Sequence, residues 1–145
     1  MINKIDSDSF NACVAMALKL WPDSQKNELT TEFKEMMSND NFEIFVFQTE
    51  SAEYAGFIQL SLRHDYVEGC LTSPVAYIEG IYVEEDYRRF GTGKKLITMA
   101  ESWARANGCS EIASDCELHN TSSRDFHYAS GFREIDRIIC FAKKI

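Results

Sequence analysis

Residues 74–108 read PVAYIEGIYVEEDYRRFGTGKKLITMAESWARANG and decide how this chain folds. The segment 75–83 is rich in β-branched and aromatic residues and is followed by three acids, which predicts a strand that ends there. From Leu96 onward, apolar residues recur every three or four positions, so a helix follows and Gly108 ends it. The rest of the chain is predicted to pack around this strand, loop and helix.

A basic, glycine-bearing loop joins the predicted strand to the helix, with the sequence RRFGTGKK at 88–95. Gly91 and Gly93 permit positive φ angles and carry no side chain that would hold a ligand away from the backbone. Amides at the N-terminus of a helix attract anions, so a bound polyphosphate would explain Lys94 and Lys95 in the first turn. The alternative is an ordinary tight turn with solvated basic side chains. The loop matches neither the dinucleotide glycine pattern nor the phosphate loop that ends in lysine and serine or threonine.

The composition indicates one domain with an acidic surface. With 145 residues, of which 45% are hydrophobic, the chain can bury one core, so we predict a single domain over 1–145. The net charge of −8 disfavours nucleic acid and anionic membranes as partners and suits cationic ligands. The N-terminal segment has no apolar signal core, and no apolar run is long enough to span a membrane, so we expect a cytoplasmic protein.

The five cysteines show neither paired metal spacing nor a C-x-x-C motif. We therefore predict reduced, mostly buried thiols and no metal site. A nucleophilic cysteine paired with one of the three histidines is the alternative.

Helical and strand patterns alternate on both sides of the central unit. Both parallel and antiparallel pairings are needed to join them, so we predict an α/β (α+β) fold with a mixed sheet. The other predicted elements are a short strand at 2–5, a helix that ends at Trp21, a helix at 24–39, a hairpin of strands at 42–48 and 54–63, a strand at 111–116, a helix at 121–130 and final strands within 132–143.

Acidic side chains cluster around the central strand in a way that hydrophobic patterning does not explain. Glu79 lies inside the apolar strand, where a carboxylate is costly unless it is paired or functional. The other candidates are Asp65, Tyr66 and Glu68 in the loop 64–73, and Asp115 at the end of the next strand. Together with Glu79 they could line an acidic pocket over the strand's end. The alternative is that the loop residues are solvated and Asp115 caps a helix or turn.

The pattern Arg88-x-x-Gly91-x-Gly93 after an acid-ended strand resembles the acyl-CoA loop of the GNAT superfamily of N-acetyltransferases. That resemblance implies a mixed, mostly antiparallel sheet flanked by helices, with acetyl-CoA as cosubstrate and no metal. It also implies that loop amides hold the pyrophosphate and that the strand's end binds the pantetheine arm and the thioester carbonyl. The residues implied for acetyl-CoA are Ile81, Tyr82, Val83, Arg88, Arg89, Phe90, Gly91, Thr92, Gly93, Lys94 and, from a second motif, Asn120.

The segment 120–132 resembles that second motif, in which an asparagine precedes a helix and an aromatic stretch precedes a Gly-Phe pair. Aligned on Gly131 and Phe132, His127 stands where the family usually has the tyrosine that protonates the departing CoA sulfur. Tyr128 stands one place later. We expect His127 to supply the proton, because histidine exchanges protons near neutral pH, with Tyr128 and solvent as alternatives.

Three further blocks resemble the aminoglycoside 6'-N-acetyltransferases: LWPD at 20–23, RHDYVEG at 63–69 and PVAYIEGIYV at 74–83. This resemblance covers essentially the whole chain. It implies direct acetyl transfer, in a ternary complex, to the 6'-amine of aminoglycoside antibiotics, which confers resistance. Glu79 is then the base, and the amide of Val83 stabilises charge on the carbonyl oxygen. The residues implied for the acceptor are Trp21, Asp65, Tyr66, Glu68, Glu79 and Asp115, among which Trp21 fits core packing equally well.

Two other functions fit the same residues. The chain could acetylate another cation, such as a polyamine or a peptide N-terminus, or it could be a non-catalytic module that binds acyl-CoA. The family also implies a homodimer, for which the apolar segment 135–142 would pair across a two-fold axis.

Overall fold

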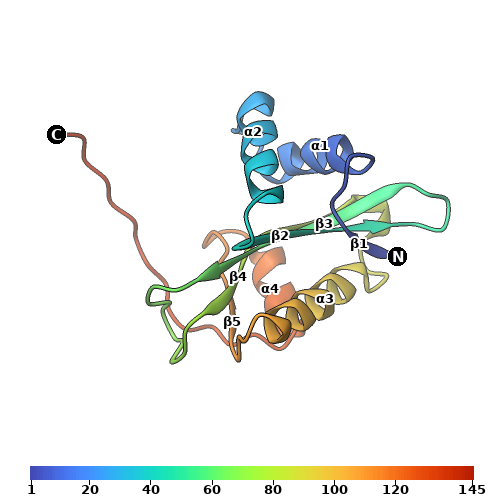
Figure 1. The fold of residues 1–145 in the computed structure, drawn as a ribbon. Helices are drawn as coiled ribbons and strands as arrows, with labels where there is room; N and C mark the ends of the chain where they lie inside the picture. Colours follow the sequence, from blue (N-terminus) through green and yellow to red (C-terminus); the bar gives the residue numbers. More distant parts are fainter.

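A five-stranded sheet runs through the middle of the molecule, with helices on both of its faces (Figure 1). The structure, a computed structural model, describes all 145 residues. Neighbouring strands are antiparallel except β4 and β5, which are parallel, so the predicted mixed, mostly antiparallel sheet is confirmed. The strands follow the order β1-β2-β3-β4-β5 and span Ile2–Lys4, Phe42–Gln48, Tyr54–Arg63, Val75–Val83 and Ile112–Ser114.

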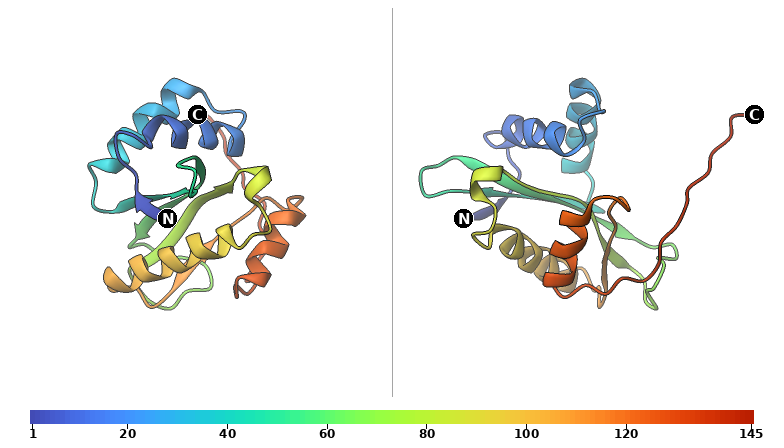
Figure 2. Two further views of the ribbon diagram at one scale, coloured as in Figure 1. Left: turned by 90° about the vertical axis from the view of Figure 1, so that its right-hand side faces the viewer. Right: turned by 180° about the vertical axis from the view of Figure 1, so that it is seen from behind.

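Two helices cover each face of the sheet (Figure 2). Helices α1 (Phe10–Leu20) and α2 (Lys26–Met37) lie on one face, and α3 (Thr92–Ala106) and α4 (Thr121–Ala129) lie on the other. A short 3-10 turn, η1 (Glu85–Tyr87), leads from β4 toward α3. The chain therefore crosses from β4 to β5 through α3, which is the connection that a parallel pair requires.

The alternation of side chains along β3 supplies a core on each face. Phe57 is fully buried among residues of α1 and α2, while Ile58 and Leu60 pack with Leu96 and Ala100 of α3. Successive residues of a strand point to opposite faces, so one apolar strand fills both cores. This explains why β3 reads as a nearly continuous apolar run.

The predicted bounds of the central strands are confirmed, since 42–48, 54–63 and 75–83 coincide with β2, β3 and β4. The helix predicted at 121–130 is α4, and Asn120 caps it by accepting a hydrogen bond from the N–H of Ser123 at 3.1 Å. The strand predicted at 111–116 is shorter, because only Ile112–Ser114 pair with β4.

The prediction of strands within 132–143 is wrong for the isolated chain. Residues 132–145 form no helix or strand, and the last part of this segment extends away from the body of the protein (Figure 1). Ile138, Ile139 and Phe141 are 75%, 80% and 90% exposed. A strand needs a neighbour for its N–H and C=O groups, and this segment has none within its own chain. Apolar composition alone therefore did not make it part of the core.

All five cysteines are free, but they are not mostly buried as predicted. Cys13 and Cys109 are buried, whereas Cys116 and Cys140 are exposed. Burial raises the pKa of the Cys13 thiol, which keeps it protonated and unreactive. None of the helices combines the length and the apolar composition that a membrane crossing requires.

Candidate functional site

Strands β4 and β5 separate halfway along β4. They pair only where Ala76–Ile78 lie opposite Ile112–Ser114, and β5 ends there. On its other side β4 stays paired with β3 as far as Val83, which lies opposite Gly56. From Glu79 to Val83, the edge of β4 that faces away from β3 has no strand beside it. We call this stretch the free edge of β4.

The backbone of Val83 faces this free edge. The N–H of the next residue, Glu84, donates to the carbonyl of Ala55 on the β3 side at 2.9 Å. Successive residues of an antiparallel ladder point their N–H and C=O groups alternately to the two sides, so those of Val83 point away from β3. The Val83 carbonyl accepts a hydrogen bond from Arg88 Nε at 2.7 Å. The N–H of Val83, which points to the same side, is available to a ligand.

The loop before α3 is a concave surface of unpaired amides. From Arg89 to Lys94 the main-chain N–H groups donate no hydrogen bond within the protein, and the first one that does is Lys95, to the Gly91 carbonyl at 3.0 Å. Arg89 and Gly91 have φ angles of 66° and 80°. Left-handed residues in such a turn direct successive N–H groups to one side, which makes an anion-binding nest at the positive end of the helix.

Glycine is required at position 93 for a different reason from the predicted one. The positive φ predicted for both glycines occurs at Gly91 but not at Gly93, which lies inside the first turn of α3. A Cβ at Gly93 would stand 2.7 Å from the ring of Phe126. Glycine is therefore required at 93 for the close packing of α4 against α3, while Arg89 takes the second left-handed position of the loop.

His127 on α4 reaches the end of β5. Its Nε2 lies 2.8 Å from Ser114 Oγ, and its Nδ1 lies 2.6 Å from the Ser123 carbonyl. Because a carbonyl can only accept, Nδ1 carries the proton in the neutral ring and Nε2 accepts from Ser114. The ring is half-buried and meets two aromatic rings edge-on, those of Phe126 and Phe132.

Tyr128 points elsewhere. Its hydroxyl donates to Glu134, which raises the pKa of the phenol, and the residue is 45% exposed. The structure therefore brings His127, and not Tyr128, to Ser114. The side-chain oxygen of Asn120 is occupied as the cap of α4.

Glu79 is the extra residue of a β-bulge, since Gln59 lies opposite Gly80 while Leu60 lies opposite Ile78. Bulges re-aim side chains, and this one turns a carboxylate onto the face that carries α1 and α2. Oε1 of Glu79 accepts from Ser61 Oγ at 2.5 Å and from Arg63 Nη2 at 2.9 Å, and Oε2 accepts from Nη2 at 3.1 Å. Pairing thus explains how an apolar strand tolerates the acid.

A second acid joins the same network. The hydroxyl of Tyr77 donates to Asp115, and the guanidinium of Arg63 lies over the Tyr77 ring at 3.3 Å from its centroid. Burial, followed by the hydrogen bond to Asp115, raises the pKa of Tyr77, so the phenol stays protonated as a donor. Glu79, Arg63, Tyr77 and Asp115 are therefore one connected set across β3, β4 and the end of β5.

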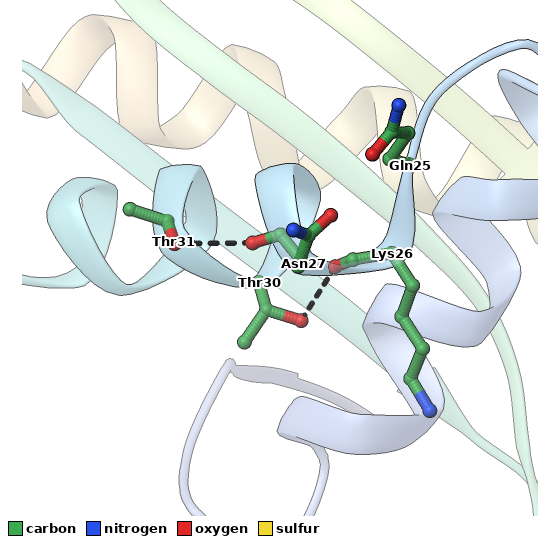
Figure 3. Close-up of a pocket in the computed structure, with 5 residues that line it drawn as sticks. All are labelled: Gln25, Lys26, Asn27, Thr30 and Thr31. Carbon is green, nitrogen blue, oxygen red and sulfur yellow. Dashed lines mark hydrogen bonds between the residues drawn. The ribbon is translucent and has the colours of Figure 1, made fainter.

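Helix α2 brings further acids to the face of the sheet that carries Glu79. The pKa of Glu32 is raised by burial and then by the negative charges of Glu35 and Glu79. Figure 3 shows the first turns of α2, where a shallow polar hollow has the threonine hydroxyls bonded back to main-chain carbonyls. An adjoining hollow continues along the helix to Glu28, Glu32 and Glu35. The residues of the first hollow are Gln25, Lys26, Asn27, Thr30 and Thr31.

Trp21 lies over β4 directly beside Glu79. Atoms of its indole would stand 2.6 Å from a Cβ at Gly80, and its ring meets that of Phe57 edge-on, with centroids 6.3 Å apart. The side chain is half-buried. Trp21 therefore packs in the core, as one of its two interpretations predicted, and it lies over the residue next to Glu79 in β4.

The loop 64–73 does not join the network. Asp65, Tyr66 and Glu68 are exposed, and no hydrogen bond or ion pair links them to Glu79. Of the C-terminal segment, Ile135 lies against this loop, close to Gly69.

Two residues of the network, Ser61 and Arg63, were missed in the sequence. They share one face of β3 with Gln59, and polar side chains at every second position of an apolar strand indicated a polar site on that face. Ser114, which contacts His127, gave no such signal, because its role depends on α4 reaching β5.

The site combines an anion nest, an unpaired strand edge with an outward amide, and an acid network beside it. This arrangement can hold a long phosphate-bearing ligand along β4 and a cation over Glu79. No group of three or more histidine, cysteine or acidic side chains is arranged to hold a metal ion.

The comparisons with known proteins agree with this geometry. The acetyltransferase (GNAT) family profile matches residues 8–132. An aminoglycoside N(6')-acetyltransferase type 1 from Serratia marcescens is 36% identical over 145 residues, which cover 100% of this chain and 99% of that protein. One from Acinetobacter baumannii is 34% identical over 99% of this chain and 98% of its own length.

Solved structures match over the whole chain. AAC(6')-Iy in complex with the bisubstrate analogue CoA-S-monomethyl-acetylneamine has a TM-score of 0.95 at 32% identity and covers 100% of this chain and 98% of that one. AAC(6')-Ih from Acinetobacter baumannii has a TM-score of 0.93 at 34% identity over 100% and 98% of the two chains. The chain is therefore a member of the GNAT acetyltransferase family, in its aminoglycoside N(6')-acetyltransferase branch.

Proposed function

We propose that the whole chain, 1–145, is one N-acetyltransferase domain that transfers the acetyl group of acetyl-CoA to the 6'-amine of aminoglycoside antibiotics. The observation that carries this proposal is the anion nest beside the free edge of β4, with the acids of Glu79 and Asp115 next to it. The matched structure of AAC(6')-Iy, whose ligand joins CoA to an aminoglycoside derivative, supports it.

The loop residues hold the pyrophosphate of acetyl-CoA. The amides from Arg89 to Lys94 lack other acceptors and can donate to phosphate oxygens, and Arg88, Arg89 and Lys94 add positive charge. The flat side of Phe90, which is 77% exposed, is available to the nucleotide. The free edge of β4 at Ile81, Tyr82 and Val83 would hold the pantetheine arm by main-chain hydrogen bonds. Thr92 and Gly93 in the first turn of α3, and Asn120 at the start of α4, would complete the CoA site.

The amine of the acceptor must lose a proton before its nitrogen can attack the thioester carbon. Glu79 receives that proton directly or through a water, since Oε2 accepts only one hydrogen bond in the structure. As the new carbon–nitrogen bond forms, negative charge grows on the carbonyl oxygen, and the N–H of Val83 can donate to it. Both substrates are bound together, so the acetyl group passes directly between them.

The carbon–sulfur bond then breaks and CoA leaves as a thiolate that needs a proton. His127 and Ser114 supply it as a pair: once His127 has taken a proton from solvent, its Nε2 proton passes to Ser114 Oγ while the Ser114 hydroxyl gives its own proton to the sulfur, and a neutral imidazole remains. Tyr128 is a weaker candidate because its hydroxyl is committed to Glu134.

Aminoglycosides carry several ammonium groups, which suits the acids of this site. Glu79, Asp115 and the loop acids Asp65 and Glu68 raise the local concentration of such a polycation and orient it. Trp21, which lies beside Glu79, and Tyr66, which is 78% exposed in the loop, offer flat faces to sugar rings.

The protein acts as a homodimer in which the exposed segment 135–142 of each copy lies on the other. Exposed side chains of Ile138, Ile139 and Phe141, together with the outer edge of β5, support this assembly. Mass measurement by light scattering is expected to give a dimer for the native chain and a monomer for Ile138→Asp/Ile139→Asp. A monomeric native chain would contradict the dimer.

We place the protein in the cytoplasm, where acetyl-CoA is available. Fractionation of cells that express the tagged chain tests this, and recovery with the membrane or extracellular fraction would contradict it.

The test of the function is CoA thiol release from acetyl-CoA with kanamycin or tobramycin as acceptor, with spermidine and a short peptide in parallel. Turnover with the drugs, lost when the 6'-amine is replaced by a hydroxyl, is the expected result. Turnover with spermidine or peptide alone would redirect the assignment to another cationic acceptor. CoA binding without turnover on any amine would make the chain a binding module.

A further inference from the structure

Arg63 forms an ion pair with Glu79, the carboxylate that the proposed acceptor needs. Its Nη2 lies 2.9 and 3.1 Å from the two oxygens of Glu79, and its Nε lies 3.2 Å from Oε1. The flat face of the guanidinium lies 3.3 Å from the centroid of the Tyr77 ring. Glu79 therefore binds the edge of the guanidinium and Tyr77 packs against its face. The two neighbours hold the group in place, so it is not a freely solvated charge.

This arrangement neutralises Glu79 while the acceptor is absent. Oε1 is saturated by Ser61 and Arg63, whereas Oε2 accepts only from Nη2. The side chains of Arg63 and Glu79 are 42% and 28% exposed, so the pair is open to competition from a cation in solution. A partly exposed pair can be exchanged at modest cost, in contrast to a fully buried one.

The neighbouring acids remain available to a cation. Asp115 accepts a hydrogen bond from the neutral hydroxyl of Tyr77, and Glu28, Glu32 and Glu35 of α2 line a hollow on the same face of the sheet. A molecule with several ammonium groups can therefore engage these acids at the same time as it competes for Glu79. A molecule with one ammonium group can compete for Glu79 alone.

We propose that Arg63 is a resident counter-ion of the acceptor site, which a polycationic acceptor displaces from Glu79 and a singly charged amine does not. The inference rests on the proposed function and deepens it. Displacing the guanidinium costs the same for every acceptor, but only a polycation recovers that cost through Asp115 and the acids of α2. Arg63 acts through Glu79, so it is a specificity-determining residue and not a catalytic one.

The test compares two acceptors of different charge, neamine with several ammonium groups and methyl 6-amino-6-deoxyglucoside with one. Arg63→Met keeps an apolar stem over Tyr77 but removes the charge, and Arg63→Lys keeps the charge but loses the fork. Arg105→Gln, on the far end of α3 with a long ion pair of 3.8 Å, is the matched control. Steady-state CoA release gives kcat and KM for each acceptor and variant.

Arg63→Met is expected to lower the KM for the monoamine about tenfold while the KM for neamine changes by less than about threefold, because one charge-assisted contact is worth about one factor of ten. Arg63→Lys is expected to retain most of the native discrimination, and Arg105→Gln all of it. If Arg63→Met does not fold, as judged by its melting curve and CoA binding, Arg63→Gln replaces it.

Two results would overturn the inference. Equal increases of KM for both acceptors would mean that Arg63 merely holds Glu79 in position. A loss of kcat with unchanged KM values would mean that it orients the base. In both cases native turnover of neamine would leave the proposed function standing, whereas a native enzyme silent with both amines would refute the proposed function and the inference with it.

Discussion

Replacing Gly91 by alanine tests whether the left-handed loop before α3 holds the pyrophosphate. Gly91 has a φ of 80°, and a Cβ there would meet nothing within 4 Å, so the substitution adds backbone strain without a clash. A non-glycine residue in that region costs roughly 1–2 kcal/mol. For a domain of this size that corresponds to a decrease in melting temperature of about 3–6 °C.

Gly108 provides a matched control for this change. Its φ is 79°, and a Cβ there would also meet nothing within 4 Å, but it lies at the other end of α3. Gly108→Ala is therefore expected to lower the melting temperature as much as Gly91→Ala does. Only Gly91→Ala relaxes the backbone that directs the amides from Arg89 to Lys94 outward.

The assay is titration calorimetry of CoA into each variant, together with thermal melting. Gly91→Ala is expected to weaken CoA binding roughly tenfold, since the loss of one charge-assisted hydrogen bond is worth at least about 1.4 kcal/mol. Gly108→Ala is expected to bind CoA as the native chain does. Equal weakening in both variants, or native affinity in Gly91→Ala, would refute the assignment of this loop to the pyrophosphate.

Four further substitutions probe the acids of the site and the proton donor. Glu79→Gln keeps a polar group beside Arg63 but removes the base, so kcat/KM is expected to fall about 100-fold or more at pH 6–9, and unchanged turnover across that range would exclude the role. His127→Phe is expected to lower kcat about tenfold, whereas Tyr128→Phe leaves it within about twofold; the reverse order would assign the proton to Tyr128. Burial, and then the neighbouring acids, raise the pKa of Glu32 above its ordinary value of 4.5. The free energy of unfolding therefore falls as the pH rises through the raised pKa and Glu32 loses its proton. Glu32→Gln is expected to have the higher melting temperature at pH 7 and the same one as the native chain below about pH 4.5, and equal melting temperatures at both pH values would contradict the raised pKa.

Local patterns in the sequence were sufficient for most of the secondary structure. Strands β2, β3 and β4 and the cap of α4 follow from apolar periodicity, polar boundaries and an asparagine, all of which act within a few residues. The nest before α3 was foreseeable for the same reason, because a left-handed turn at a helix start depends chiefly on its glycine.

The sequence by itself determined the elements, the mixed sheet and the identity of Glu79 as an acid that needs a partner. Only the tertiary structure decided what that partner is, because Arg63 and Ser61 reach Glu79 across a bulge whose position depends on strand register. It likewise decided that His127 meets Ser114 and that Gly93 makes room for Phe126. The end of the C-terminal segment shows the same limit: the apolar side chains of Ile138, Ile139 and Phe141 predict burial, but they are exposed because a single copy of the chain gives them no surface to pack against.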